Sequence, residues 1–546
     1  MTGGGPTPVA ASVSVANFHH GLAWITVAAA AVACVPAGLR WLRVAQREHY
    51  LAGSAVRFAA RWWTITAVNR AMAGMAVAAG VISVWWPPVG VVTAAAVVAG
   101  PLGLSWKGRT APLAWTRRLR TLAGIWAVLE IVVVVLGVVT GLASVLAVVA
   151  ALAVPLLVDA ACVVTAPVER RLSEHFIVDA GRRLARVAPI VVGITGSYGK
   201  TSTKNHLAHL IEPTLSVVAT PASFNNRAGL ARAVNEHLTD GTRVFIAEMG
   251  TYGPGEIADM CGWCPPTVAV ITAIGPVHLE RFGTEERIVE AKSEIAVPAR
   301  DVVIQVDDPR LAALADRLEA GGKHVVRCSA SDPAADVSVI RDADPGRTTV
   351  TVTVDRETVA TGIELPTGVQ PSNLACAIGA ARSVGVETAA IVAALADLPP
   401  VGHRLQAVGS PSGFTILDDT YNSNPTGARA ALTALRDRTG SGSSNGSGAP
   451  GRGTATVVTP GMVELGSRQR AENFSFGAEI AGVADNLVVV GRTNRQALMA
   501  GAASNPAAEV AVTWVADRPQ AVAWVRDHLG PGDTVLYEND LPDHYP

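Results

Sequence analysis

Charge is scarce in this sequence, and neither sign dominates. Only 16% of the 546 residues are charged, and 44 Lys and Arg residues stand against 45 Asp and Glu residues, for a formal net charge of -1. A chain without a basic excess offers no electrostatic reason to propose a nucleic-acid partner. Hydrophobic residues make up 49% of the chain, which is high for a soluble enzyme. The length predicts about two to four domains.

Cysteine is also scarce, which excludes a fold held together by disulfides. The six cysteines are Cys34, Cys162, Cys261, Cys264, Cys328 and Cys376. Only Cys261 and Cys264 have a suggestive spacing, and without a second pair they make a poor zinc site. A redox pair is one interpretation of them, and a simple loop before the apolar run 267–275 is the other. We expect a reducing compartment for the soluble part.

The first apolar run has no basic leader before it, so it is not a typical signal peptide. Five runs approach the ~20 residues that a helix needs to cross a bilayer. They cover about 21–39, 71–86, 89–105, 122–140 and 143–164. The sequence therefore predicts a membrane domain over residues 1–165 with about five transmembrane helices. A re-entrant pair over 71–105 is the alternative.

Positive charge predicts the orientation of these helices, because cytoplasmic loops are enriched in Lys and Arg. The connections near 87–88 and 140–142 carry no charge. The other connections contain Arg40, Arg43, Arg47, Arg57, Arg61 and Arg70, then Lys107, Arg109, Arg117, Arg118 and Arg120, then Arg170, Arg171, Arg182, Arg183 and Arg186. We expect the N-terminus outside the cell membrane, a basic cytoplasmic linker over 166–186, and the remaining domains in the cytoplasm.

Two acidic residues, Glu130 and Asp159, interrupt the apolar runs. A carboxylate inside a membrane is a functional-site hypothesis by default, because burying it is costly. The structural alternative is that Asp159 reaches the cytoplasmic edge and that Glu130 finds a partner within the helix bundle.

From residue 187 onward, short apolar strands alternate with helical stretches. The runs "IVVGITG", "RVFIAEMG", "TVAVITAIG" and "DVVIQVDD" predict buried parallel strands, and "DVSVIRD" and "TTVTVTVD" predict antiparallel ones. This alternation predicts a P-loop-type α/β domain over 187–400. A second, Rossmann-like α/β domain is predicted over 401–546, with a flexible Gly/Ser loop at 439–453. The predicted fold is thus an α-helical membrane bundle followed by two α/β domains.

The stretch "VVGITGSYGKTSTKN" at 191–205 joins a strand to a helix through a glycine-rich turn. Glycines let backbone amides face a phosphate, and a helix N-terminus favours the anion. In such a loop Lys200 reaches the terminal phosphates, and the Thr201 hydroxyl can ligate Mg²⁺. The strict pattern requires glycine where Ile194 stands, so this is a variant loop, with Gly196 inside it and Gly199 before the lysine.

Three further side chains follow apolar segments of the same domain. Glu248 ends the strand "VFIAE", where a carboxylate opposite the loop can hold a nucleotide's Mg²⁺. His278 lies just past the next strand, and Lys292 lies in a helical stretch. Taken alone, His278 could be an ordinary loop histidine, and Lys292 could be an ordinary solvent-exposed lysine on a helix.

Taken together, these motifs resemble the Mur ligase family. They are "GITGSYGKTSTKN", "SFNNRAGL", "EMGTYGPGEIADM", "AVITAIGPVHLERFG" and "AKSEI", followed by "ILDDTYNSNPTGARAAL" and "GMVELG". Their order and spacing are most similar to the branch that adds D-alanyl-D-alanine. The resemblance covers roughly 187–546, so it excludes the apolar N-terminal part.

The resemblance implies a role for each matching residue. It implies catalytic roles for Lys200, His278 and Lys292, and metal ligands in Thr201, Glu248, His278 and a carbamylated Lys292, with ATP and two Mg²⁺ ions as cofactors. It implies nucleotide contacts for Gly196, Ser197, Gly199, Lys200, Thr201, Ser202, Asn226, Asn373, Arg404 and Asp419. Asn225 is expected to line the same cleft, with Tyr421 and Asn424 shaping the face of the last domain. His403 departs from the small residue that usually precedes Arg404.

The implied reaction is ATP-dependent amide-bond formation between a carboxylate acceptor and an amine donor, through an acyl phosphate, in cell-envelope or peptidoglycan precursor synthesis. Members of this branch carry an N-terminal soluble domain that binds the UDP end of the acceptor, and this chain has apolar runs in its place. The sequence is therefore compatible with a small-molecule acceptor and with a lipid-linked one. It is also compatible with a poly-amino-acid product. An ATP-driven transporter using Glu130 and Asp159, and a non-catalytic scaffold, are alternatives from other classes. The intact Lys200, Glu248, His278 and Lys292 favour the ligase.

Overall fold

The computed structural model describes residues 8–546 except for short stretches, which are 109–112, 222–223, 343–348, 367, 400–405, 421–423, 440–452, 505–508, 542–543 and 546. The chain divides into two compact units. An N-terminal unit comprises Met1–Leu172 together with Leu541–Pro546, and an α/β unit comprises Ser173–Asp540.

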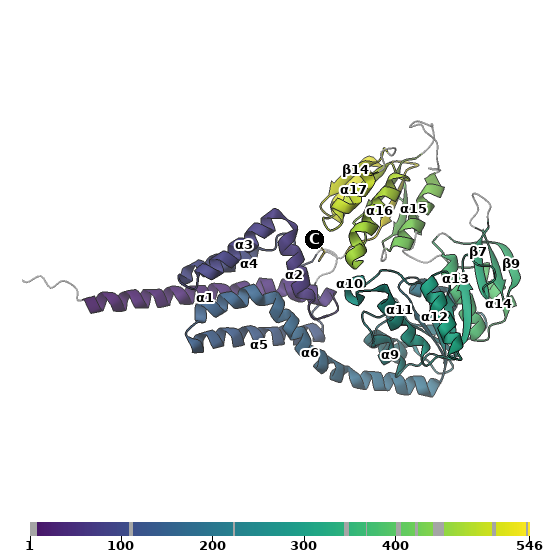
Figure 1. Ribbon diagram of the computed structural model, residues 1–546, viewed down its shortest axis with the longest axis horizontal. Helices are drawn as coiled ribbons and strands as arrows, with labels where there is room; N and C mark the ends of the chain where they lie inside the picture. The colour runs from purple at the N-terminus through teal and green to yellow at the C-terminus, as the bar shows by residue number, and fades with distance from the viewer. Residues whose placement is uncertain are drawn as a thin grey trace, which may run out of the picture. The chain divides into compact units, whose positions relative to one another are not determined.

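The N-terminal unit is helical (Figure 1). Its elements are α1 (Pro8–Arg47), α2 (Ser54–Ile65), α3 (Ala67–Ile82), the 3-10 turn η1 (Pro87–Val89), α4 (Gly90–Ala99), α5 (Arg117–Thr140) and the first part of α6 (Ala143–Val187). Among the described residues, three helices are long and apolar enough to cross a membrane, or up to four if the pair α2 and α3, bent by 113°, counts as one span.

The expected span at 89–105 is wrong as a complete crossing. Helix α4 has only 10 residues, or about 15 Å at 1.5 Å per residue, against ~30 Å of hydrocarbon. It stops at Ala99 because Gly100 and Pro101 follow, and proline has no N–H with which to continue a helix. Helix α3 packs against this short α4 across η1. The geometry agrees better with the alternative of a re-entrant pair than with two separate spans.

Both acidic residues of the apolar runs have structural partners. The Asp159 carboxylate accepts hydrogen bonds from the backbone N–H groups of Ala55 (3.1 Å) and Val56 (2.9 Å), which are unpaired donors of the first turn of α2. The Glu130 carboxylate accepts from the Trp126 indole N–H at 3.0 Å and contacts the Cys34 thiol at 3.7 Å. Glu130 therefore does pair within the bundle, whereas Asp159 is a buried cap and does not reach an exposed edge.

Two arginines predicted to be loop charges, Arg40 and Arg43, lie on α1, and their side chains are buried. The Arg40 guanidinium donates to carbonyl oxygens at the end of α4 and in the turn after it, between residues 97 and 104. Arg43 donates to the carbonyl oxygen of Ser105 at 3.1 Å. Arg40 thus satisfies carbonyls in the last turn of α4 that have no partner within the helix, and Arg43 satisfies one in the segment that follows. They contribute to packing rather than to the cytoplasmic charge on which the orientation was based.

The first sheet of the α/β unit has nine strands within the described residues, in the order β2-β3-β1-β4-β5-β6-β7-β8-β9. They are β1 (Ile190–Thr195), β2 (Val217–Ala219), β3 (Val244–Glu248), β4 (Val268–Ile271), β5 (Asp301–Gln305), β6 (His324–Ser329), β7 (Val337–Arg341), β8 (Thr349–Val354) and β9 (Glu357–Glu364). The four predicted parallel strands are confirmed as β1, β3, β4 and β5. The predicted antiparallel pair is confirmed as β7 and β8.

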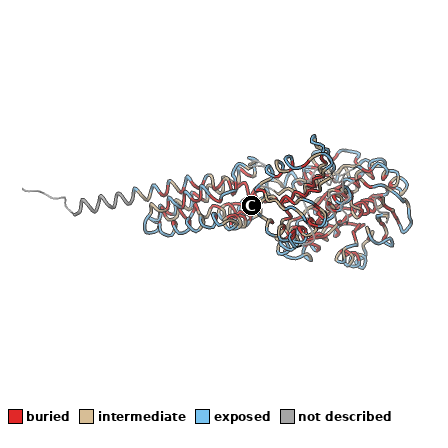
Figure 2. The backbone as a smooth tube through the Cα atoms, turned by 90° about the horizontal axis from the view of Figure 1, so that it is seen from above, coloured by how far each residue is buried: buried red, intermediate tan, exposed pale blue. Residues whose placement is uncertain are grey.

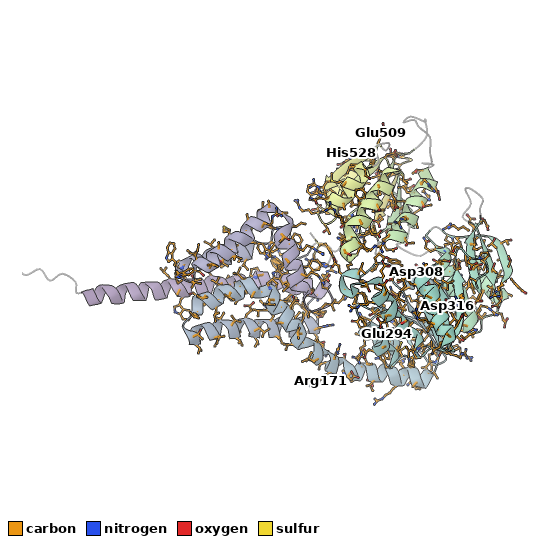
Figure 3. The ribbon with its side chains drawn as sticks, viewed as in Figure 1. Arg171, Glu294, Asp308, Asp316, Glu509 and His528 are labelled. Atoms are coloured by element: carbon orange, nitrogen blue, oxygen red, sulfur yellow. The ribbon has the colours of Figure 1, made fainter. Side chains whose placement is uncertain are left out.

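Helices cover both faces of this sheet, as in other doubly wound folds. They are α7 (Lys200–Ile211), α8 (Arg227–His237), α9 (Glu256–Cys261), α10 (Leu279–Phe282), α11 (Glu285–Ser293), the 3-10 turn η2 (Glu294–Ala296), α12 (Pro309–Ala320), α13 (Pro371–Ser383) and α14 (Thr388–Leu395). One apolar core lies with α8, α9 and α11, and a second lies with α7, α13 and α14. Figure 2 colours the buried residues red along the chain. Asp308, labelled in Figure 3, caps the start of α12.

The second sheet has six strands among the described residues, in the order β10-β11-β15-β12-β13-β14. They are β10 (Gln406–Gly409), β11 (Thr415–Asp419), β12 (Ala455–Thr459), β13 (Asn486–Val490), β14 (Ala511–Val515) and β15 (Thr534–Glu538). All neighbours pair in parallel except β10 with β11. The helices are α15 (Pro425–Thr439), the 3-10 turn η3 (Gly466–Arg468), α16 (Gln469–Ala481), α17 (Arg495–Ala503) and α18 (Arg518–His528).

The predicted linker over 166–186 is helical and forms part of the 45-residue helix α6. Ile177, Ala180 and Leu184 on its last turns belong to the apolar core with α8 and α9. The helix therefore contributes to the α/β unit as well as to the N-terminal unit. At the other end of the chain, residues 541–546 group with the N-terminal unit, although we expected them to complete the second α/β domain. Most of the predicted Gly/Ser loop lies outside the described residues.

Candidate active site

The glycine-rich loop connects the end of β1 to the start of α7 and is fixed by the turn after β4. The Thr272 hydroxyl donates to the carbonyl oxygens of Thr195 (3.1 Å) and Tyr198 (2.5 Å). The Ser197 N–H donates to the carbonyl of Ala273 at 2.7 Å, and the Ser197 hydroxyl to that of Gly275 at 3.2 Å. The loop is therefore held at the carboxyl ends of two adjacent parallel strands, where ligands of α/β sheets bind.

Both loop glycines are required by close contacts. A Cβ atom at Gly196 would lie 1.9 Å from the Thr272 hydroxyl oxygen, and one at Gly199, whose φ is +79°, would lie 2.0 Å from the Asn373 amide oxygen. Asn373 on α13 is thus brought against the loop itself. The Lys200 ammonium donates to the carbonyl oxygens of Gly196 (2.7 Å) and Ser197 (3.3 Å), so it folds over its own loop.

Glu248 ends β3 beside the loop, because β3 pairs with β1 and Glu248 lies opposite Ile194. Its buried carboxylate accepts from the Thr201 hydroxyl at 3.1 Å and from the Asn225 amide at 3.2 Å, and it pairs with the Lys204 ammonium at 3.1 Å. The sequence analysis missed Lys204. Its position four residues after Lys200 places both lysines on the same face of α7 and could have indicated it.

Lys292 and His278 complete the predicted catalytic set. Burial lowers the pKa of the Lys292 ammonium well below its usual value, and the nearby Lys200 charge lowers it further. Burial also lowers the pKa of His278, although the Glu464 carboxylate opposes this shift. Both therefore favour their neutral forms, which are the forms that bind a metal or react with carbon dioxide.

The donor chemistry of this region fits Mg²⁺ in part. Glu248 supplies a carboxylate and Thr201 a hydroxyl, both hard oxygen donors. Within the described residues, however, no group of three or more His, Cys, Asp or Glu side chains is close enough to hold a metal ion. A second anionic ligand has to come from elsewhere, and carbamylation of Lys292 is the chemistry that converts a buried amine into one.

Residues of the last domain reach His278. The Glu464 carboxylate, from the loop before η3, bonds to the His278 ring and lies 3.7 Å from the Arg281 guanidinium. The Tyr252 ring packs edge-on against the His278 ring, with 5.0 Å between their centroids. The Arg281 guanidinium lies over the Tyr252 ring, 4.5 Å from its centroid. Glu464 was not singled out by the sequence analysis, although it lies inside the motif "GMVELG".

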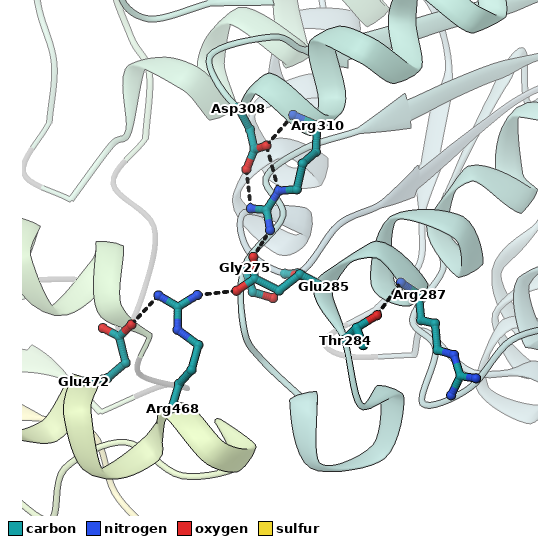
Figure 4. Close-up of polar contacts among 9 residues, drawn as sticks. Gly275, Thr284, Glu285, Arg287, Asp308, Arg310, Arg468 and Glu472 are labelled. Atoms are coloured by element: carbon teal, nitrogen blue, oxygen red, sulfur yellow. Dashed lines mark hydrogen bonds and ion pairs between the residues drawn. The ribbon is translucent and has the colours of Figure 1, made fainter.

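A second charged contact joins the two α/β domains (Figure 4). Glu285, at the start of α11, pairs with Arg310 of α12 and with Arg468 of η3. Arg310 is also paired with Asp308 at 2.6 Å, and Arg468 with Glu472 at 2.8 Å. Positive and negative side chains thus alternate across this contact, from Asp308 to Glu472.

Several other predicted site residues have structural roles. Ser202 is buried in the first turn of α7. The Asn226 side chain caps α8 by accepting from the Gly229 N–H at 2.9 Å, and Asn424 caps α15 through Gly427 at 2.9 Å. The amide that contacts the Glu248 carboxylate is that of Asn225. Arg404, His403 and Tyr421 lie outside the described residues.

Asp419 ends β11 beside Glu538, the last residue of β15. Burial raises the pKa of the Glu538 carboxyl to about 8, and the Asp419 charge contributes to the rise. The Thr459 hydroxyl donates to Glu538 at 2.7 Å. Sequence reasoning found Asp419 and missed Glu538, because nothing local marks a strand-end glutamate as buried.

The redox interpretation of Cys261 and Cys264 finds no support. All six cysteines lie in the described part of the chain and are unpaired and buried. Burial raises the pKa of the Cys261 thiol to about 12 and also raises that of Cys264. Reactive cysteines need the opposite shift, because the thiolate is the nucleophile.

Comparison with known proteins matches both α/β domains. Residues 194–381 match the Mur ligase middle domain, and residues 403–537 match the Mur ligase glutamate ligase domain. The chain is 34% identical over 367 residues to the UDP-N-acetylmuramoyl-tripeptide--D-alanyl-D-alanine ligase of Mycobacterium leprae, which covers 63% of this chain and 70% of that protein. The enzyme of the same name from Mycobacterium tuberculosis is 36% identical over 366 residues, covering 63% and 69%.

Solved structures match the same region. MurF ligase from Thermotoga maritima in complex with ADP superposes with a TM-score of 0.54 at 27% identity, covering 67% of this chain and 80% of that one. MurF from Acinetobacter baumannii superposes with a TM-score of 0.56 at 23% identity, covering 67% and 77%, a likeness of fold.

Proposed function

Because this chain belongs to the Mur ligase family and is an ATP-dependent, MurF-like amide ligase of peptidoglycan precursor synthesis, we propose that it works tethered to the membrane and forms its product through an acyl phosphate. The observation that carries the chemistry is the glycine-rich loop at the strand ends, with Lys200 above it and Thr201 bonded to Glu248. Mur ligases use ATP and Mg²⁺, and the Thermotoga relative was solved with ADP.

We assign the loop 196–202 to the phosphates of ATP. Its backbone amides and the N-terminus of α7 favour an anion. Lys200 neutralises the terminal phosphates, and on binding it exchanges the carbonyl oxygens of Gly196 and Ser197 for phosphate oxygens. Asn373 lies against Gly199, so it supports the loop. From this position its side chain is proposed to approach the adenine base of ATP. Asp419 and Arg404 remain proposed contacts from the last domain.

Mg²⁺, when bound, supplies positive charge to the phosphate oxygens in the transition state. Thr201, Glu248, His278 and a carbamylated Lys292 are the residues proposed to hold it. Carbamylation joins the neutral Lys292 amine to carbon dioxide and releases one proton. Its requirement for a neutral amine agrees with the lowered pKa of this buried lysine.

The proposed reaction has two steps, and the chain positions both. An acceptor carboxylate oxygen attacks the γ-phosphorus of ATP, and ADP leaves. The amine nitrogen then attacks the carbonyl carbon of the acyl phosphate, inorganic phosphate leaves, and the nitrogen loses its proton. Lys200 stabilises charge on the transferred group in both steps. Glu464 and Arg468 hold the last domain against the first, which is where an amine donor bound to the last domain has to arrive.

Membrane tethering is supported by the apolar helices and by what they leave exposed. The best window of α5 has a mean hydropathy of 2.7 but is only 17% buried. Its exposed side chains include Val128, Ile131, Val135, Leu136 and Val139. An apolar surface of this extent is typical of contact with lipid. Three spans with a re-entrant pair give the same sidedness as five spans, so the ligase domains stay in the cytoplasm.

The acceptor is then a carboxylate presented near the membrane, either UDP-linked, as in the names of the relatives, or lipid-linked. The test measures phosphate release by the full chain in detergent, with ATP, Mg²⁺, UDP-muramoyl-tripeptide and D-alanyl-D-alanine. Lys200→Ala is the inactive control, and Lys323→Ala, outside the site, is the matched control that keeps activity. Release that requires both substrates supports a tethered MurF-like enzyme. Release only with a lipid extract and the amine supports a lipid-linked acceptor. No release with either contradicts the proposed reaction.

A further inference from the structure

His544 and Tyr545 are buried within the N-terminal unit, whereas strand β15, which precedes them in sequence, belongs to the α/β unit. Leu541–Pro546 group with Met1–Leu172, and the strand β15 ends at Glu538, only six residues before His544. His544 is 2% exposed and Tyr545 is 8% exposed. Segments near a chain end are usually poorly ordered unless specific contacts fix them.

Polar contacts fix this segment to the corner between α1 and α2. The Trp62 indole N–H donates to the backbone carbonyl of His544 at 2.7 Å. The His544 ring nitrogen Nε2 lies 3.0 Å from the Glu48 carboxylate, and the Arg57 guanidinium lies 3.2 Å from the other oxygen of that carboxylate. Glu48 is only 4% exposed. A buried carboxylate is costly without hydrogen-bonding partners, so both of these partners contribute to its burial.

Aromatic contacts surround the polar ones. The Phe58 ring lies 4.9 Å from the His544 ring and 5.0 Å from the Tyr545 ring, in an edge-on arrangement with Tyr545. The Arg61 guanidinium lies over both Phe58 (5.2 Å) and Tyr545 (5.6 Å). Edge-on aromatic pairs and cation–π contacts both stabilise a packed segment beyond simple burial. Two residues of the segment thus receive a hydrogen bond, an ion pair and three aromatic contacts.

We propose that this corner, the tail site, formed by Glu48, Arg57, Phe58, Arg61 and Trp62, is a docking site for the chain's own segment His544–Tyr545. Docking makes the chain a closed loop, because it anchors the end of the last ligase domain to the unit from which α6 departs. Six residues span at most about 22 Å, so the docked segment limits how far β15 can move from the tail site. The inference concerns only this tether, so it is independent of which acceptor the ligase uses.

The test measures the accessibility of His544 in the full chain. Diethyl pyrocarbonate acylates exposed imidazoles, and mass spectrometry reports the rate at each histidine. His528 (Figure 3) and His237 are exposed and serve as internal references. In detergent micelles we expect His544 to react at least about tenfold more slowly than the references, because reaction requires local opening. Equal rates in the unmodified chain would overturn the proposal.

Variants of the tail site separate docking from general protection. Trp62→Phe keeps the ring and removes the donor, and Glu48→Gln keeps the shape and removes the charge. Both are expected to bring His544 close to the reference rate. Trp514→Phe is the matched control, because it removes the same kind of indole-to-carbonyl bond, to Gly491, in the α/β unit. If a tail-site variant fails to fold, Tyr545→Ala weakens docking from the side of the docked segment, and the reaction rate of His544 is compared in the same way. Protection that survives all three variants contradicts the assignment.

The tether itself is measured with spin labels at Arg120→Cys and His528→Cys. Both positions are exposed, whereas the six native cysteines are buried, so labelling is selective. We expect the distance distribution between the labels to broaden in Trp62→Phe and Glu48→Gln and to stay unchanged in Trp514→Phe. An unchanged distribution in both tail-site variants would show that the segment docks without restraining the domain, and would reject the tether.

Discussion

Two buried carboxylates, Asp159 in the N-terminal unit and Glu248 in the α/β unit, have different kinds of partner. Asp159 accepts from backbone amides at the start of α2, and Arg40 in the same unit donates to backbone carbonyls in the last turn of α4, so each of these charges completes a helix end. In the α/β unit, the Glu248 carboxylate is met by three side chains, Thr201, Asn225 and Lys204. Side chains can exchange partners without unfolding a helix, whereas backbone groups cannot. The partner of a buried charge, more than its burial, therefore distinguishes a structural group from one available for chemistry.

The comparison is tested most severely at Lys204. Lys204→Met leaves the Glu248 carboxylate buried without its cation, and breaking a buried pair in this way typically costs about 3–5 kcal/mol. We expect a large fall in the melting temperature of the α/β unit, measured by calorimetry. Adding Glu248→Gln to the same chain removes the unpaired charge and should recover most of that loss. If the double variant is as unstable as the single one, the ion pair is not the cause.

Glu248→Gln alone should lower both activity and stability, because Glu248 is a proposed metal ligand and the partner of the buried Lys204 ammonium. It keeps the hydrogen-bonding shape but removes a proposed metal ligand, and we expect ATP-dependent phosphate release to fall by at least about a hundredfold. The melting temperature should also fall, so phosphate release is measured at a temperature at which calorimetry shows the variant to be folded. Asp259→Asn on the exposed start of α9 is the matched control. Full activity in Glu248→Gln would place this residue with the structural charges.

Glu538 shows a third way to bury an acid, which is to keep its proton. Because burial raises its folded-state pKa to about 8, above the usual 4.5, the unfolded chain loses this proton at lower pH than the folded one does. The stabilisation is complete below about pH 4.5 and is lost progressively as pH rises towards 8. From pH 5 to pH 7 the free energy of unfolding of the unmodified chain should therefore decrease by about 2 kcal/mol more than that of Glu538→Gln. Chemical denaturation at both pH values measures this, and parallel pH profiles would contradict it.

The smallest effect is expected at the helix cap. Asp159→Ala leaves the N–H groups of Ala55 and Val56 unpaired, and loss of a cap costs about 1–2 kcal/mol. Thermal unfolding in detergent should report a modest decrease, and the rate of phosphate release should stay the same. Asp179→Ala, at an exposed position on α6, is the matched control. A selective loss of turnover in Asp159→Ala would revive the hypothesis that this acid has a function of its own.

The sequence predicted those parts of the molecule that local patterns determine. The loop at 196–202 and strands β1, β3, β4 and β5 follow from hydrophobic runs and from a spacing of glycine, lysine and hydroxyl residues that the phosphate-binding geometry requires. Glu248 was found because it ends a strand next to the loop. These features need only neighbours in sequence or the general rule that parallel strands end at one edge.

The missed features depend on contacts between distant residues. Glu464 reaches His278 from 186 positions away, and Trp62 reaches His544 from 482 positions away. Arg40 appeared to be a loop charge, because the sequence does not show that α4 ends within reach of it. Asn226 appeared to be a cleft residue, because two adjacent asparagines cannot be told apart until the helix start is known. In each case the long-range packing decided the role.

The continuous helix α6 has a consequence for how the protein is made. A growing chain emerges from the ribosome N-terminus first, and domains fold as they emerge. The apolar side chains of Ile177, Ala180 and Leu184 leave the ribosome before strand β1 and helix α8, which provide their partners. Until those partners follow, the apolar face formed by these three residues stays exposed to water at the end of α6, a helix whose first part already lies in an apolar unit. Pauses in translation soon after residue 187 should therefore increase misassembly more than pauses after residue 400, when the first α/β domain can already have closed over that stripe.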